Sequence, residues 1–541
     1  MDWTQARCGA MSVTQTAARM VTLTVIDSTG GRSEIAADRG HSLSQALFAA
    51  GLRPALPLCS GLGRCGLCRV RYLAGPGGVP EPLDIEAEIL PPEELAAGMR
   101  LACRRDLRQG DVIELPAVSS SVPAEERELL ATPAGPLRLA VDLGTTSVHW
   151  EAYADGTVTA RGRALNPQLG AGSEVMSRLA LAAAGEGGLL RRVVLDLIER
   201  ITHGLPGPVE SMCVAGNPAM TYLLLGLAPD GLARAPYRLD FRGGVWQSLS
   251  PDLPPCYIPP LLGPFAGGDL SAGLAALDLP GAAGAEPGFP FLLADLGTNG
   301  EFALALDKDR VIVASVPLGP ALEGIGLRHG SLAGPGVATR FNLGPQGLTW
   351  SVPGDSGRPV AVSGTGYLSL VAALLRVGLL DAQGGFRPEA RTPLAQRLAR
   401  ELSVTAAGEA RLRMASGLWL HASDVEELLK VKAAFNTALS ALLAEAGLTA
   451  SGLKAVLLAG ALGEHAAPGD LERLGFLPPA LAGRARVAGN TSLSGARRLL
   501  DSEPARVGLA RLADRATVLD LASRPGFQKD YFTRMVFEYV P

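Results

Sequence analysis

Four of the seven cysteines lie close together in the first fifth of the 541-residue chain. Cys59, Cys65 and Cys68 form a C-x5-C-x2-C pattern within LCSGLGRCGLCRV, and 34 residues separate Cys68 from Cys103. An odd number of cysteines, clustered in this way, is more typical of a metal site in a reducing compartment than of a disulfide framework. The sequence therefore predicts a metal centre on these four thiolates and a cytoplasmic location.

The same stretch permits three interpretations. GLGRCG (61–66) matches the dinucleotide pattern G-x-G-x-x-G, but a true fingerprint follows a strand and opens a helix. Here RPALPL, with two prolines, precedes the motif and the extended-looking CRVRYL follows it. Structural zinc stays an alternative, since four thiolates of any spacing can form a tetrahedron. Three ligands in one loop and a distant fourth are typical of a [2Fe–2S] ferredoxin, so we predict that cluster.

Glycines and arginines surround the predicted ligands. Gly61, Gly63 and Gly66 are expected to adopt positive φ and to turn backbone N–H groups toward a cluster. The flanking arginines are either solvated surface residues or a patch for docking and for tuning the potential: Arg64, Arg69, Arg104 and Arg105.

Two related turns form the second group of residues suited to chemistry, DLGTTS (142–147) and DLGTNGE (295–301). Each follows an apolar strand. Tight glycine-containing turns present backbone amides to phosphate oxygens, and an aspartate beside them can hold Mg²⁺ or orient a water molecule. Asp142 and Asp295 are 153 positions apart (295 − 142), which indicates two similar α/β halves.

This order of signals, followed by LAGALG (458–463), resembles the superfamily of acetate and sugar kinases, heat-shock chaperones and actin. The resemblance implies an actin-like α/β ATPase in which two RNase H-like halves close on ATP. It implies roles for Asp142, Asp295 and Glu301 toward metal, water and phosphate, with Glu323 in GPALEG as a weaker candidate. The remaining nucleotide contacts that it implies are Gly144, Thr145, Thr146, Ser147, Gly297, Thr298, Asn299, Gly300, Gly460 and Gly463.

The elements that must position these residues follow from patterns along the chain. VTLTVIDSTGGRSEIA predicts two strands around a turn, LSQALFAAGL a short helix, and CRVRYLAG another strand. Helices are also expected at 193–201 and 424–447, and a strand in KAVLLAG. The predicted order is an N-terminal extension (1–19), an α+β β-grasp ferredoxin domain (20–117), a Pro/Ser/Ala-rich linker (118–136), a first actin-like half (137–288) and a second (289–541).

Composition excludes some partners. The formal net charge is −4 and charged residues make up 19% of the chain, so there is no electrostatic reason to expect nucleic acid or an anionic membrane. No stretch offers about 18 apolar residues without charge or proline, so we expect no membrane span.

A ferredoxin joined to an actin-like ATPase resembles the reductive activators of corrinoid proteins. Further blocks carry the resemblance: ALNPQ with EVMSR (164–178), GNPAMTYLLLGL (216–227), GPALEG (319–324), SGTGYLSLVAALL (363–375) and LGFLP (474–478). It implies a repair reaction, in which ATP in the actin-like part drives one-electron reduction of an inactive Co(II) corrinoid to Co(I). Its cofactors would be the [2Fe–2S] cluster, ATP and Mg²⁺.

The implied partner is a corrinoid protein or a cobalamin-dependent methyltransferase, served by an electron donor for which the sequence holds no motif. A homodimer is implied as well. Two other functions stay open on the residues alone. One is an actin-like small-molecule kinase with a redox-sensing ferredoxin domain, and the other is a non-enzymatic assembly ATPase with structural zinc.

Overall fold

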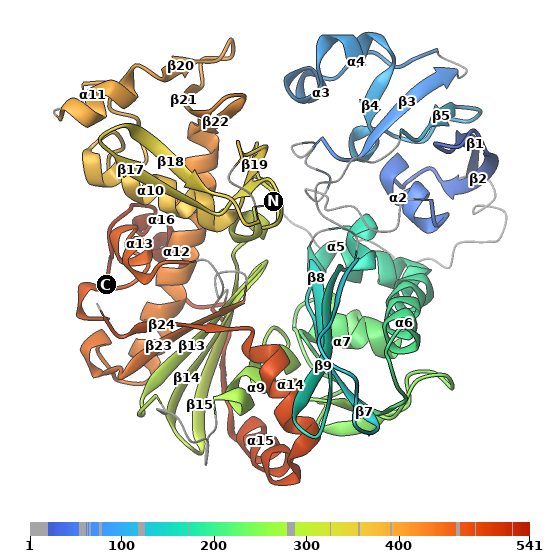
Figure 1. Cartoon of the computed structure of the whole chain (residues 1–541), viewed down its shortest axis with the longest axis vertical. Coiled ribbons are helices and arrows are strands. Elements are labelled where there is room, and N and C mark those ends of the chain that lie inside the picture. The colour runs from blue at the N-terminus through green and yellow to red at the C-terminus, as the bar shows by residue number, and fades with distance from the viewer. Residues whose placement is uncertain are drawn as a thin grey trace. The chain divides into compact units, whose positions relative to one another are not determined.

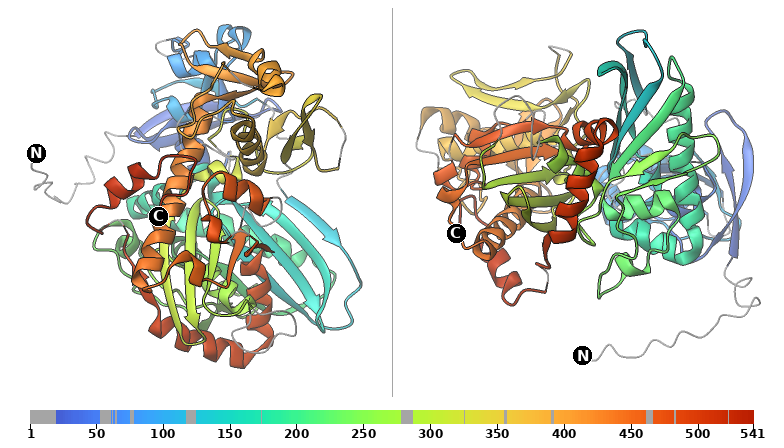
Figure 2. Two further views of the ribbon diagram at one scale, coloured as in Figure 1. Left: turned by 90° about the vertical axis from the view of Figure 1, so that its left-hand side faces the viewer. Right: turned by 90° about the horizontal axis from the view of Figure 1, so that it is seen from below.

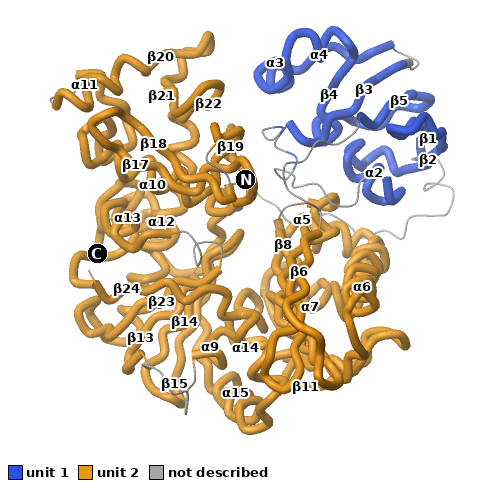
Figure 3. The backbone as a smooth tube through the Cα atoms, in the orientation of Figure 1, with its two compact units in different colours: residues 1–119 blue, residues 120–541 orange. Residues whose placement is uncertain are grey.

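The computed structural model divides into two compact units, residues 1–119 and 120–541 (Figure 3). It describes residues 20–52, 61, 63, 66–74, 78–116, 125–172, 174–277, 287–324, 326–354, 357–389, 392–460, 466–481, 483–521 and 523–541. Of the predicted site residues, Cys59, Cys65 and Gly463 lie outside this set.

The first unit is built on a five-stranded sheet of order β2-β1-β5-β3-β4. β1 alternates buried and half-buried side chains, as expected of a strand with one face on a core. The helix α2, Leu43–Ala49, begins at a capping box of Ser42 and Gln45 and covers that core. The strands are β1 Met20–Ile26, β2 Arg32–Asp38, β3 Arg69–Ala74, β4 Met99–Leu101 and β5 Val112–Glu114, and two short helices are α3 Asp84–Ile89 and α4 Pro92–Ala96. The predicted hairpin, helix and following strand are confirmed.

The first half of the second unit contains a seven-stranded sheet of order β11-β12-β10-β7-β8-β9-β6 (Figure 1). Its strands are β6 Glu125–Leu129, β7 Leu137–Leu143, β8 Ser147–Ala154, β9 Thr157–Leu165, β10 Val209–Gly216, β11 Val245–Gln247 and β12 Cys256–Ile258. The main helices of this half are α5 Val175–Leu181, α6 Gly187–His203, α7 Pro218–Leu225 and α9 Gly268–Ala276.

The expected linker, 118–136, is not continuous loop. β6 lies inside that range and pairs antiparallel with β9 from Glu125↔Ala164 to Leu129↔Ala160. The sequence of β6, EEREL, does not alternate apolar and polar residues, because an exposed edge strand does not need a buried face. The pattern therefore did not predict a strand there.

The second half contains a six-stranded sheet of order β24-β23-β13-β14-β15-β25. Its strands are β13 Phe291–Leu296, β14 Asn299–Asp307, β15 Arg310–Pro317, β23 Ala455–Gly460, β24 Ala485–Gly489 and β25 Thr517–Leu519. The main helices are α10 Gly364–Val377, α12 Ala422–Glu445, α14 Thr491–Asp501, α15 Glu503–Arg515 and α16 Phe527–Thr533. β7–β8 and β13–β14 repeat one antiparallel pairing, each closed by a predicted Asp-Leu-Gly-Thr turn.

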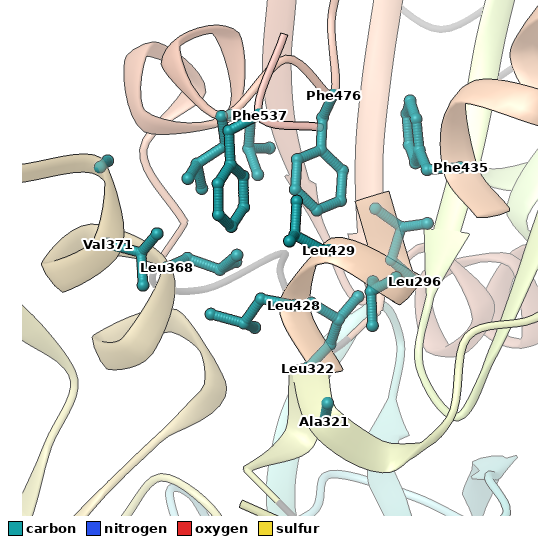
Figure 4. Close-up of a cluster of buried hydrophobic side chains, with 14 of the residues drawn as sticks. Leu296, Ala321, Leu322, Leu368, Val371, Leu428, Leu429, Phe435, Phe476 and Phe537 are labelled. Atoms are coloured by element: carbon teal, nitrogen blue, oxygen red, sulfur yellow. The ribbon is translucent and has the colours of Figure 1, made fainter. Parts of the chain in front are cut away.

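Alternating side chains of β13 pack into two different cores. Leu292 and Leu296 face α10 and α12, in the cluster that also takes in Phe476 and Phe537 (Figure 4). Leu293 faces α9, α14 and α15 on the other side. The sheet therefore lies between two helical layers, as a strand that is apolar on both faces requires.

Close packing of α9 against α14 joins the two halves of the second unit; the two helices are labelled in Figure 1, and Figure 2 gives two further views. Gly495 of α14 meets Ala272 of α9 so closely that a Cβ at position 495 would lie 1.8 Å from the carbonyl oxygen of Ala272. Gly273 makes a similar close approach, with a Cβ position 3.0 Å from Thr491 Oγ1. Helices pack at such short range only where side chains are absent.

No helix in the described part of the chain is long and apolar enough to cross a membrane.

The α9–α14 contact predicts opposite effects for two glycine substitutions within helices. Gly495→Ala should lower the unfolding free energy by about 1–3 kcal/mol, because the new methyl group displaces α14 from α9. Gly508→Ala, in α15, has no neighbour within 4 Å of the new Cβ and should stabilise the chain by up to about 1 kcal/mol. Calorimetric melting of both variants would check this, and equal midpoints would contradict the packing argument.

Candidate functional site

The two Asp-Leu-Gly-Thr turns meet at one cavity of about 230 Å³ in the second unit. Thr146 Oγ1 of the first turn and Thr298 Oγ1 of the second are 3.3 Å apart. Of the residues predicted from sequence, the following line the cavity: Asp142, Gly144, Thr145, Thr146, Ser147, Asp295, Gly297, Thr298, Asn299, Glu301, Glu323 and Gly460. The repeat in the sequence has therefore become a single site.

Asp142 is held at the end of β7 by residues that arrive from the second half. Asn490 Nδ2 donates to Asp142 Oδ2 at 2.7 Å, and Ser492 Oγ donates to Asp142 Oδ1 at 2.9 Å. Asn490 is also the N-cap of α14, because its Oδ1 accepts the N–H of Leu493. One helix start thus fixes both oxygens of this carboxylate.

The second turn is shaped by glycines and by Glu323. Thr298 Oγ1 donates to Glu323 Oε1 at 2.8 Å, so the weaker sequence candidate is part of the site. A Cβ at Gly460 would lie 2.2 Å from Asp295 Oδ1, so only glycine fits where β23 passes this carboxylate. Gly300 differs from the other predicted residues. It packs against Leu318 and Phe302 and is not among the residues that line the cavity.

Five carboxyl groups surround the cavity, namely Asp142, Asp269, Asp295, Glu301 and Glu323. Burial raises the pKa of Asp269 to about 6, in spite of a hydrogen bond with Glu301 that lowers it. Burial, and then the charges of Asp269, Asp142 and Glu323, raise the pKa of Asp295 well above its ordinary value. The side chain of Asp295 is partly exposed, and it lines the partly open cavity.

Glu301 is the most buried of the five, at 5% exposure. Burial and the nearby charge of Asp269 raise its pKa well above the ordinary value. Its Oε2 is buried and has no hydrogen-bond partner among the described residues. Crowded carboxylates that share protons, with one oxygen left unpartnered, are the arrangement expected where a cation completes the site.

The chemistry of the lining fits a magnesium nucleotide. Carboxylate oxygens suit Mg²⁺, and threonine hydroxyls with glycine-flanked amides suit phosphate oxygens. Among the described residues, no three His, Cys, Asp or Glu side chains are close enough to hold a metal ion by themselves. Mg²⁺ typically takes one or two carboxylates and completes its shell with water and substrate phosphates.

Several cavity residues escaped the sequence analysis. Asp269 is the second residue of α9, whose N-cap is Gly267. Asn217 is the N-cap of α7 and donates to Thr145 Oγ1 at 2.9 Å. His149 Nε2 and Ser147 Oγ are hydrogen-bonded at 3.1 Å. GDLSAG, GNPAM and GNTSLSG each carry a polar residue just before or within a helix start. That signal is visible in the sequence, but it does not reveal which helix starts converge.

The described cysteines of the predicted cluster lie at neighbouring positions in the first unit. β3 pairs with β4 at Arg69↔Leu101, and Cys68 accepts a backbone hydrogen bond from Ala102 at 2.8 Å. Cys68 and Cys103 therefore stand at the same end of the antiparallel pair β3–β4. Cys68 is buried and Cys103 is half-buried.

The glycines between the cysteines have the predicted conformation. Gly61, Gly63 and Gly66 have φ of 80°, 76° and 65°. A Cβ at Gly61 would lie 4.0 Å from the carbonyl oxygen of Cys103, which places this point of the loop beside the fourth predicted ligand. Thiols at one end of an antiparallel strand pair, beside a glycine-rich backbone, fit an iron–sulfur cluster.

Of the four flanking arginines Arg64 lies outside the described residues, and the other three have partners within the unit. Arg104 Nη1 donates to the carbonyl oxygen of Gly61 at 3.1 Å, and Arg69 Nη1 donates to Glu94 at 3.4 Å. Arg105 Nε donates at 3.0 Å to Glu86, which is fully buried. These contacts favour a structural role for the three over an open docking patch.

Family models match the chain in three consecutive segments. A 2Fe-2S iron-sulfur cluster binding domain matches residues 26–105, a RACo middle region matches 137–281, and the C-terminal domain of RACo, described as the ASKHA domain, matches 290–539. The order agrees with the predicted fold, a ferredoxin domain followed by an actin-like ATPase.

Two curated proteins are similar in sequence. The chain is 30% identical over 432 residues to the corrinoid activation enzyme RamQ of Eubacterium limosum, covering 74% of this chain and 70% of that protein. It is 28% identical over 273 residues to a [Co(II) methylated amine-specific corrinoid protein] reductase of Methanosarcina barkeri, covering 46% of each.

A solved structure shares the fold along nearly the whole chain. The reductive activator for corrinoid,iron-sulfur protein superposes with a TM-score of 0.65 at 21% identity, covering 95% of this chain and 98% of that one. The matching family models and these relatives, together with the Cys68–Cys103 strand pair and the cavity at the two turns, identify this chain as a member of the family of corrinoid activation enzymes, the reductive activators of corrinoid proteins.

Proposed function

We propose that this protein uses ATP to drive the one-electron reduction of a partner's Co(II) corrinoid to Co(I). The observation that carries the proposal is that one chain of this family contains both the β3–β4 strand pair beside Cys68 and Cys103 and the carboxylate-lined cavity at the two turns. One part is suited to electron transfer and the other to nucleotide. Reduced cluster and Co(II) give oxidised cluster and Co(I), so the electron count balances with one external low-potential donor.

Cys59, Cys65, Cys68 and Cys103 are the proposed ligands of a [2Fe–2S] cluster, which when bound supplies a one-electron redox centre. The protein's own contribution is the frame. Glu86 accepts hydrogen bonds from Arg105 and from the N–H of Leu101, and so anchors the chain on both sides of Cys103. Burial of Cys68 shields one ligand from water.

The cavity is the proposed site of MgATP. Thr145, Thr146 and Thr298 would meet phosphate oxygens. Of Asp142, Asp295 and Glu301, one or two would bind Mg²⁺ directly and the rest would bind its water molecules. Gly460 is the described part of the proposed adenosine turn, and Gly463 is its other proposed residue.

ATP can favour one arrangement of the two halves only by binding it more tightly than the other. Asp142 belongs to the first half, and its hydrogen-bond donors Asn490 and Ser492 belong to the second. Nucleotide or Mg²⁺ at this carboxylate therefore acts directly on a contact between halves. We propose that this contact links nucleotide state to productive binding of the corrinoid partner. A cytoplasmic location and a homodimer belong to the same proposal.

The direct test is reduction of Co(II) in a corrinoid protein. Protein reduced with titanium(III) citrate and freed of excess reductant should convert a methylated amine-specific Co(II) corrinoid protein to Co(I) in the presence of MgATP, and much less without it. The visible absorption of Co(I) is the readout. Phosphorylation of a small molecule without any Co(I) would instead support the kinase, and a colourless zinc protein would support the assembly ATPase.

Separate substitutions should disable the two parts independently. Cys103→Ser should remove the visible absorption of the cluster and electron transfer, with nucleotide affinity unchanged. Asp295→Ala should keep the absorption and weaken MgATP binding by about tenfold or more, because a carboxylate that faces the bound cation is lost. Absorption spectra and titration calorimetry measure the two properties.

Cys213→Ala is the matched control for Cys103→Ser. Cys213 is a buried thiol of β10 in the second unit, so its removal should change neither property. Loss of both properties in both site variants would contradict the assignment of one function to each unit.

Binding of MgATP should strengthen as pH rises through about 6. Below that value Asp269 is protonated, because its pKa is raised to about 6, and Glu301 and Asp295 also hold protons more firmly than usual. Cation binding must displace those protons, which costs up to about tenfold in affinity per pH unit for each proton. Calorimetry in buffers of different ionisation enthalpy would count the released protons, and Asp269→Asn should reduce that count. An affinity and a proton count that do not vary with pH would refute this assignment.

A further inference from the structure

Two consecutive carbonyl groups of the first turn accept hydrogen bonds from completely buried side chains. Asn166 Nδ2 donates to the carbonyl oxygen of Gly144 at 2.7 Å, and Arg178 Nη2 donates to that of Thr145 at 2.6 Å. Asn166 and Arg178 are both 0% exposed, and neither lines the cavity. They contact the turn from behind.

The geometry of the peptide bond means that these two hydrogen bonds also fix the direction of the neighbouring N–H groups. In a trans peptide the C=O of one residue and the N–H of the next point in opposite directions. Holding the Gly144 and Thr145 carbonyls against the buried side chains therefore directs the N–H groups of Thr145 and Thr146 to the opposite side, where both residues line the cavity. Neither N–H donates a hydrogen bond to a described residue. Two free N–H groups in succession form a site for an anion.

The two side chains are themselves held in place. Asn166 Oδ1 accepts the N–H of Gln168 at 2.9 Å, and Arg178 Nε donates to the carbonyl oxygen of Gly172 at 2.8 Å. Gln168 Oε1 accepts from Arg178 Nη1 at 3.3 Å. ALNPQ and EVMSR, conspicuous in the sequence but without a role there, are thus one network behind the turn.

Arg178 also places a buried positive charge behind the turn. Its partners at close range are carbonyl oxygens, the amide oxygen of Gln168 and the sulfur of Met220, with no carboxylate among them. Burial lowers its pKa to about 9, while the charge of Glu323 raises it, so the group is charged at neutral pH. In the second turn, by contrast, the one hydrogen bond that the Thr298 carbonyl accepts from a described residue comes from a backbone N–H, that of Leu318 at 3.3 Å.

We propose that Asn166 and Arg178 are positioning residues that aim the N–H groups of Thr145 and Thr146 at a phosphate group of the bound nucleotide. This inference rests on the proposed nucleotide binding and adds the means by which the first turn recognises phosphate. The recognised chemistry is a phosphate anion, and the adenosine part of the nucleotide is not involved.

The test compares ligands that do and do not carry phosphate. Arg178→Met and Asn166→Ser should each weaken binding of MgATP by about tenfold or more, since the N–H groups lose their alignment. Binding of adenosine should change less than about twofold, because it carries no phosphate. Arg178→Lys, which keeps the charge but not the fork of donors, should give an intermediate loss.

Arg191→Met is the matched control. Arg191 also holds two backbone carbonyls, donating to Leu224 at 3.1 Å and to Leu249 at 2.7 Å, in the same half but outside the cavity lining. It should lower the melting temperature about as much as Arg178→Met while leaving MgATP affinity unchanged.

Unchanged MgATP affinity in both Arg178→Met and Asn166→Ser would overturn the inference, as would equal losses of MgATP and adenosine binding. Failure of the unaltered protein to bind MgATP would overturn the proposed function together with this inference. If the unaltered protein binds MgATP and both variants bind it equally well, only the positioning role is refuted and the proposed function stands.

Discussion

The site depends on the close contact of α9 with α14. Each helix carries one residue of the cavity at or near its start, Asp269 on α9 and Asn490 before α14, and each belongs to a different half. Because Gly495 permits the backbone of α14 to approach Ala272, the starts of the two helices converge on the end of β7. A longer side chain at 495 would separate them, and Asp142 would lose the donors that fix both of its oxygens.

Around this contact the protein concentrates negative charge. Five carboxyl groups share a small cavity, and the arginine that also lines it, Arg163, is paired with Glu126 at 2.6 Å. Burial first, and then the charges of neighbouring carboxylates, raise the pKa values of Asp295 and Glu301, so both groups hold protons more firmly than usual. Opposite them, the first turn presents amide groups backed by Arg178. A cation with a polyanion satisfies both sides together.

The sequence was informative wherever a local pattern encodes the structure. The strand-turn-strand repeats around Asp142 and Asp295, the ferredoxin-like spacing and the long apolar helices all have short-range signatures. Asp269, Asn217 and Asn490 were not found, because their roles arise only when three separate helix starts meet. Arg178 appeared in a recognisable block, yet nothing in a linear sequence shows that a side chain lies behind a turn 33 residues earlier. β6 was missed because it is an exposed edge strand, and its sequence has no alternation of apolar and polar residues.

The contact of Gly460 with Asp295 has a consequence for conformational entropy. The backbone of β23 forms a wall against one oxygen of the carboxylate, at a spacing that excludes even a methyl group. The side chain of Asp295 is therefore confined before any ligand arrives. Its loss of rotational freedom belongs to the folding of the chain and not to the binding of a cation, so the affinity of the site is not reduced by ordering that group.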